Sequence, residues 1–252
     1  PEHTARSISW NGIASYGAIA IGAPLGYVMS HELGFFTLGI ALTLMAAFAL
    51  LVIRKQASVP VLKGERLPFW SVFGRIAPYG LGLTLASIGY GTITTFITLF
   101  YVSRGWEGAA WCLSVFGVCF IAARLLFITA INRLGGFTSA ILCMGVETLG
   151  LVLLWVAPNT GFALTGAGLT GLGLSLVYPA LGVEAIKQVP ATSRSAGLSS
   201  YAVFFDLALA IAGPIMGAIA LGLGYEWIFF FASVLSLAGL GLTVLLSRRP
   251  RL

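Results

Sequence analysis

Three charged side chains stand inside long apolar stretches of this sequence: Arg124, Glu147 and Asp206. An ionisable group at membrane depth costs at least about 2.5 kcal/mol, so it usually faces a cavity or a partner and is a candidate functional site. One guanidinium can fully neutralise only one of the two carboxyls. A carboxyl without a full charge partner can bind and release a proton. The three residues are therefore candidates for proton or ion coupling.

The depth of each residue indicates which of them could meet. At 1.5 Å per residue, Arg124 lies about 10 Å, Asp206 about 12 Å and Glu147 about 15 Å from the basic end of its apolar stretch. Arg124 could reach either acid, and Glu147 is the easier partner because it belongs to the next helix of the same hairpin. We therefore expect Asp206 to be the carboxyl that carries the proton. The alternative is a purely structural network of the three charges.

The elements that must position these residues are membrane helices. Of the 252 residues, 58% are hydrophobic and 9% are charged, and the mean hydropathy is +0.98, whereas a soluble domain carries about 25% charged residues. A helix needs about 20 apolar residues to cross a bilayer, and continuous rather than alternating apolar runs favour helices over a β-barrel. The sequence predicts an all-α membrane protein with eight transmembrane helices, at residues 9–29, 34–53, 76–102, 110–131, 137–157, 161–183, 198–220 and 227–246.

Positive charge gathers at one end of these predicted helices. That end holds twelve of the fourteen Lys and Arg residues, the opposite end has only Arg104, and Arg124 lies within a helix. Because Lys and Arg concentrate in cytoplasmic loops, both termini are predicted to be cytoplasmic. The asymmetry also accounts for the net charge of +6, so no nucleic-acid partner is required.

The cysteines and histidines argue against several kinds of chemistry. Cys112, Cys119 and Cys143 lie in apolar stretches without C-x-x-C spacing, which supports neither a disulfide framework nor a thiolate metal site. His3 and His31 lie in polar segments outside the apolar stretches, where they could not serve a nucleophile or a zinc-bound water in the membrane. We expect no catalytic residue, no metal and no cofactor, and therefore no enzyme.

The first and seventh predicted helices share a pattern. Segment 22–26 reads Gly-Ala-Pro-Leu-Gly and segment 213–217 reads Gly-Pro-Ile-Met-Gly, with their prolines 214 − 24 = 190 residues apart, and ten residues beyond each proline a glycine follows. Helices one and two thus look like a copy of helices seven and eight in the same orientation. Helices three to six should then have a copy too, which predicts four helices ahead of Pro1 and a complete protein of twelve. Two parallel six-helix halves are the layout of major facilitator transporters.

Several segments resemble that superfamily directly. Gly17, Gly22, Pro24 and Gly26 resemble the antiporter motif on the fifth helix of its exporters, with Ala23 where that motif usually has Gly. The stretch from Arg124 to Gly136 resembles the loop motif between helices eight and nine, through Asn132, Arg133, Gly135 and Gly136, with Asn132 where an Asp is usual. Segments 174–182 and 205–207 also resemble the family, and segments 9–12 and 182–184 and the rest of the chain are most similar to its YfcJ/YhhS-type bacterial subgroup.

The resemblance implies a partial major facilitator fold that covers helices five to twelve. Residues 1–53 would form the last two helices of the N-terminal half, 54–75 a cytoplasmic linker and 76–252 the C-terminal six-helix half. It also implies a multi-pass protein of the bacterial inner (plasma) membrane, a small-molecule substrate, and a monomer when full length. The expected function is proton-coupled efflux by alternating access. Alternatives are a sugar or metabolite facilitator or importer of the same fold, a truncated fragment that does not transport, a membrane-embedded enzyme, and a structural assembly partner.

Two further sets of residues are expected to take part in transport. The glycines and enclosed proline of each repeated segment would let backbones approach and bend the helix, which predicts gating at Gly22, Pro24, Gly26, Gly213, Pro214 and Gly217, with static packing as the alternative. Cavity-lining residues are expected at Tyr79, Tyr90, Thr94, Thr95, Phe96, Tyr178 and Phe204, with ordinary packing as the alternative for each. Glu184 and Lys187 are expected to form a solvated helix end at the cytoplasmic mouth.

Overall fold

The computed structural model describes residues 34, 36–37, 39–50, 66–127 and 129–248. Within these residues the protein is helical and has no strand, and six helices are long and apolar enough to cross a membrane. They are α2 (Phe69–Ser103), α3 (Ala109–Phe127), α5 (Gly136–Trp155), α6 (Thr160–Ile186), α7 (Arg194–Leu223) and α8 (Tyr225–Ser247). The short helix α4 (Ala130–Leu134) and the 3-10 turn η1 (Ala191–Ser193) lie between them. The prediction of an all-α membrane fold is confirmed.

The last six predicted membrane helices are present, and their ends differ from the prediction. Helix α2 begins at Phe69 rather than at residue 76, and α7 begins at Arg194 rather than at 198. Charged residues mark the ends of the apolar stretches, but a helix can continue past the bilayer core into water. The predicted helix 110–131 is wrong at its end, because α3 stops at Phe127 and α4 is a separate helix. Predicted helix 9–29 lies outside the described residues, and of 34–53 the structure describes a shorter apolar helix, Gly39–Leu50.

Turn residues separate the helices where their local chemistry predicts. Residues 156–159 divide α5 from α6, and the Asn159 side chain caps α6 by accepting a hydrogen bond of 3.1 Å from the Phe162 N–H. Gly224 separates α7 from α8 with a φ of 108°, a backbone conformation that favours glycine. Gly34, which the internal repeat pairs with Gly224, also has a positive φ, of 78°.

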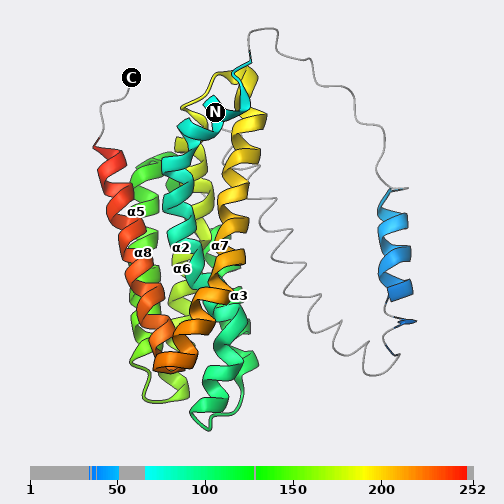
Figure 1. Ribbon diagram of the computed structural model, residues 1–252, viewed down its shortest axis with the longest axis vertical. Helices are drawn as coiled ribbons and strands as arrows, with labels where there is room; N and C mark the ends of the chain where they lie inside the picture. Colours follow the sequence, from blue (N-terminus) through cyan, green and yellow to red (C-terminus); the bar gives the residue numbers. More distant parts are fainter. Residues whose placement is uncertain (1–33, 35, 38, 51–65, 128, 249–252) are drawn as a thin grey trace.

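The six long helices run side by side in one bundle (Figure 1). Helix α6 packs along α5 and α3, while α2 packs along α7 and α8 and also contacts α6. Helices α2 and α6 are the most buried of the six, and α3 and α7 are the most exposed within the described residues. The two central helices, α2 and α6, therefore hold the bundle together, and α3 and α7 flank them.

Glycines let α5 and α6 approach closely. A Cβ added at Gly150 or Gly166 would fall within 3 Å of backbone atoms on the facing helix, and one at Gly173 would overlap the backbone between Cys143 and Glu147. Small residues at such positions are what membrane helices use to pack without a hydrophobic driving force. This glycine contact sets the short distance between α5 and α6 at the level of Glu147.

Candidate functional site

Arg124 is a buried cation at the junction of α3 and α6. Its side chain is 1% exposed, and Nη2 donates a hydrogen bond of 2.8 Å to the Ser175 carbonyl on α6. The Ser175 hydroxyl in turn donates to the Phe120 carbonyl on α3, at 2.7 Å. The guanidinium also lies over the Phe120 ring, 5.1 Å from its centroid, a distance suited to a cation–π contact. These contacts keep the positive charge in place at membrane depth.

Glu147 is not the partner of Arg124 within the described structure, so that expectation is wrong. Its side chain is 0% exposed on α5, and neither carboxyl oxygen has a hydrogen-bond partner. The reason is the position of α6. Helices α3 and α5 follow one another in the chain, yet each packs along α6 rather than along the other.

Asp206 lies in the same region as Arg124, with Tyr178 close to both. Asp206 is exposed on α7 among the described residues. Tyr178 lies on α6 three residues beyond Ser175, which accepts the Arg124 hydrogen bond, and its ring meets that of Phe205, the residue before Asp206, at 5.8 Å. The structure thus places one carboxylate and one fixed cation around a shared phenol group.

Six aromatic side chains from four helices surround this region. Tyr90 of α2 stacks on Phe116 of α3 and on Phe205 of α7, with ring centroids 5.5 and 6.3 Å apart. Tyr178 meets Phe205 edge-on at 5.8 Å and Tyr201 at 5.1 Å. We call the set the aromatic cluster; its members are Tyr90, Phe116, Phe120, Tyr178, Tyr201 and Phe205. It joins α2, α3, α6 and α7.

Four of the seven predicted cavity residues fall into two groups. Tyr90 and Tyr178 belong to the aromatic cluster, beside Asp206. Phe204 and Phe96 are buried packing residues instead: the Phe204 ring lies against Gly80 and stacks on Phe73 at 5.1 Å, and Phe96 packs near Gly217. Consecutive helical residues such as 204 and 205 point about 100° apart, so only one of such a pair can face the cluster.

The remaining three predicted residues, Tyr79, Thr94 and Thr95, are not members of the aromatic cluster. Tyr79 contacts Phe137 of α5, with centroids 6.1 Å apart. Thr94 and Thr95 are exposed, and the Thr94 hydroxyl donates to the Tyr90 carbonyl at 2.9 Å.

Four members of the aromatic cluster were missed from the sequence. Phe116 and Phe120 are four residues apart on α3, and Tyr201 and Phe205 are four apart on α7. Aromatic residues at this spacing share one helix face. That spacing is the signal that could have found them.

The predicted gating glycines have no close neighbour among the described residues. No described atom comes within 4 Å of a Cβ added at Gly213, and at Gly217 the nearest atom is in the Phe96 ring, at an ordinary 3.6 Å. Pro214 lies inside the continuous helix α7. Gly22, Pro24 and Gly26 lie outside the described residues. Gating at these positions stays a prediction.

The predicted loop motif and the start of α5 lie next to the buried end of α6. Asn132 and Arg133 are exposed on α4, and Gly135 has a φ of 85° where α5 begins. A Cβ added at Gly136 would lie 2.7 Å from the Glu184 carboxylate.

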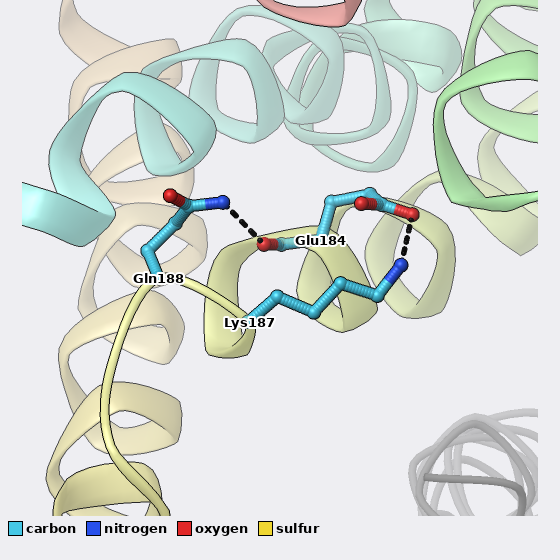
Figure 2. A network of polar contacts seen from close by, with 3 residues as sticks. All are labelled: Glu184, Lys187 and Gln188. Atoms are coloured by element: carbon cyan, nitrogen blue, oxygen red, sulfur yellow. Dashed lines mark hydrogen bonds and ion pairs between the residues drawn. The ribbon is translucent and has the colours of Figure 1, made fainter. Parts of the chain in front are cut away.

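Glu184 is buried rather than solvated, which corrects the expectation for this residue. Its side chain is 5% exposed and Oε1 lies 2.7 Å from Nζ of Lys187, whose side chain is 52% exposed (Figure 2). The Gln188 side chain donates to the Glu184 carbonyl at 3.3 Å, and Arg75 of α2 reaches the Gln188 carbonyl at 3.3 Å. The solvated end that the sequence predicted is therefore Lys187 alone.

Comparison with known proteins agrees with this helical architecture. Residues 108–252 match the Major Facilitator Superfamily. An uncharacterised transporter of the major facilitator type from Pseudomonas aeruginosa strain LESB58 is 55% identical over 249 residues, which cover 99% of this chain and 62% of the relative. A second such transporter, from Burkholderia mallei strain SAVP1, is 51% identical over 251 residues, with the same two coverages of 99% and 62%. The chain therefore spans 62% of the length of these relatives. By this match and these identities, the chain belongs to the major facilitator superfamily.

Proposed function

We propose that the protein is a proton-coupled secondary transporter that exports small molecules by alternating access. Membership of the superfamily supports transport across a membrane, and the likeness of segment 22–26 to the antiporter motif supports export. On this proposal the chain corresponds to helices five to twelve of a monomeric inner-membrane transporter. It would be related to the YfcJ/YhhS-type subgroup and have both termini in the cytoplasm.

The observation that carries proton coupling is the position of Asp206. It is an exposed carboxylate at membrane depth, next in the chain to Phe205, whose ring meets Tyr178 on the same helix that binds the buried Arg124. The adjoining aromatic cluster supplies the apolar surface with few polar groups that small-molecule sites usually have. A carboxyl in such a place can take up a proton in one orientation of the transporter and release it in the other.

Asp206→Asn tests this role in the full-length protein reconstituted in lipid vesicles. Asparagine has a similar shape to the protonated acid and cannot release a proton. We expect efflux driven by a proton gradient to be lost, while exchange of substrate across the membrane without a gradient survives. The substrate for the assay can be identified by comparing what cells export with and without the protein.

Glu226→Gln is the matched control, because Glu226 is an acid in the first turn of α8. It should leave gradient-driven efflux unchanged. Normal gradient-driven efflux by Asp206→Asn would contradict the proton role and favour a facilitator. Poor expression of Asp206→Asn that Arg124→Gln restores would show a structural charge pair instead.

A further inference from the structure

Glu147 is a fully buried carboxyl that the proposed transport cycle does not use. Its side chain is 0% exposed, and neither Oε1 nor Oε2 has a hydrogen-bond partner among the described residues. At 1.5 Å per residue it lies about 16 Å along α5 from Gly136, near the middle of the bilayer. The other buried glutamate, Glu184, contrasts with it, because Lys187 lies 2.7 Å from its carboxylate.

Two helices close over the Glu147 carboxyl with glycines. From α2, Gly89 faces it: a Cβ added there would lie 3.1 Å from Oε1 and 2.9 Å from Cδ1 of Leu151. From α6, Gly173 places its backbone directly against the Glu147 backbone. A larger residue at either position would push the helices apart, so the two glycines enclose the carboxyl tightly.

The groups around the carboxyl offer it no counter-charge. The facing residues of α2 and α6 are glycines, and α8 meets α5 at the next residue, where the Thr148 hydroxyl donates to Ser236 at 3.1 Å. Cys143, one turn earlier on α5, is a partly buried thiol. A thiol or thiolate cannot neutralise a carboxylate.

An ionised carboxylate is therefore incompatible with this packing. Burying a charge without a partner or hydrogen bonds costs far more than burying the neutral acid, so the group takes up a proton instead. The uncharged acid fits the enclosed, apolar space between α2, α5 and α6. A bound proton is thus part of the packing of these three helices.

We propose that Glu147 is a second proton-binding site, distinct from Asp206, whose proton keeps the junction of α2, α5 and α6 closed. When the proton leaves, the carboxylate needs water or a cation, and either can reach it only if the contacts at Gly89 or Gly173 open. Occupancy of the site therefore couples protonation to helix packing. The binding site itself stands on the burial and isolation of the carboxyl, and only its use in transport rests on the proposed function.

Infrared difference spectroscopy of the full-length protein in lipid detects this proton directly. A protonated carboxyl gives a C=O stretch that an ionised one lacks. We expect the wild type to show this band at neutral pH and Glu147→Gln to lose it. Glu184→Gln is the matched control: Glu184 is paired with Lys187, so this variant should keep the band.

The change of Tm with pH gives a second measure of the proton on Glu147. Above about pH 4.3, where a glutamate in an unfolded chain loses its proton, the folded protein holds one proton more than the unfolded chain. Stability then falls as the pH rises. Glu147→Gln and Glu147→Leu have no proton to lose, so both should make the fall of Tm with pH shallower than in the wild type.

Two results would overturn the proposal: a protonated-carboxyl band of undiminished size in Glu147→Gln, or the same fall of Tm with pH in the wild type and both Glu147 variants. Using two variants guards against one that fails to fold. The band does not depend on turnover. A band lost in Glu147→Gln, in a protein that shows no proton-driven efflux, would therefore support the proton site and refute the proposed function.

Discussion

At the scale of single residues, two neighbouring tyrosines have different tasks. Tyr201 is fully buried, and its hydroxyl donates a hydrogen bond of 3.0 Å to the Tyr178 carbonyl, which ties α7 to α6. The Tyr178 ring packs edge-on against Phe205, the residue before Asp206, with centroids 5.8 Å apart. The first hydroxyl stabilises the bundle, and the second lies at the candidate site.

Removing each hydroxyl separates the two tasks. Tyr201→Phe should lower the free energy of unfolding by about 0.5–1.5 kcal/mol, the usual value of one hydrogen bond, and leave the pH dependence of transport unchanged. Tyr178→Phe keeps the ring contacts, so it should leave Tm unchanged and alter the pH dependence of transport. Thermal unfolding and pH-dependent efflux by the full-length variants check both expectations. The opposite pattern would remove Tyr178 from the candidate site.

The residue types of the site could be predicted, whereas their contacts could not. Charge inside an apolar stretch identifies Arg124, Glu147 and Asp206 from the sequence alone. Which of them meet depends on the helix that lies between them, and chain order does not give this. Glu147 follows Arg124 in one hairpin, yet α6 packs between α3 and α5.

At the scale of helices, glycine decides how closely α5 and α6 pack. A Cβ at Gly173 would overlap backbone atoms of Cys143 and Glu147, and backbone cannot move aside as the end of a side chain can. At Gly145, on α5, the nearest atom to an added Cβ is in the Leu240 side chain, at 3.8 Å. The two glycines therefore differ in the space around them.

Alanine substitutions should reveal this difference. Gly173→Ala must separate α5 from α6, and such overpacking typically costs about 1–3 kcal/mol, so we expect a clear fall in Tm. Gly145→Ala has room and gains up to about 1 kcal/mol of helix propensity, so its Tm should be equal or higher. Thermal unfolding of the two purified variants measures both. Equal Tm values would show that the α5–α6 contact adapts easily.

Six of the eight apolar stretches are present as membrane-length helices in the part of the chain that the structure describes, so the existence of these six helices could be predicted from hydropathy. Helix ends and helix neighbours could not. The end of α3 at Phe127 depends on the turn into α4, and no charge marks that turn. The glycine pattern of segment 213–217 predicts a close contact, but spacing does not say which helix lies opposite, and the tight glycine contacts occur at Gly150, Gly166 and Gly173 instead.

At the scale of the whole molecule, the two ends of the bundle differ in their number of positive charges. Helix α2 begins after Arg66 at one end and reaches Arg104 at the other. The helices alternate in direction, so Arg133, Lys187, Arg194 and Arg248 all return to the end where α2 begins. The opposite end carries Arg104 and an aromatic group in which Trp155 lies 5.9 Å from Trp227, centroid to centroid. Basic loops mark the cytoplasmic side, and tryptophans gather where the bilayer meets water.

Cysteine labelling tests the orientation that this asymmetry predicts. In a cysteine-free version of the full-length protein, a single cysteine is placed at Arg104, Asn159, Arg133 or Arg194, all exposed positions outside the apolar cores of the helices. An impermeant thiol reagent added to intact cells should label the cysteine at Arg104 or Asn159, because the loops after α2 and α5 face away from the cytoplasm. It should spare the cysteine at Arg133 or Arg194 until the membrane is made permeable, and that later labelling shows that each thiol is reactive. Labelling of Arg133 from outside, with Arg104 protected, would reverse the orientation.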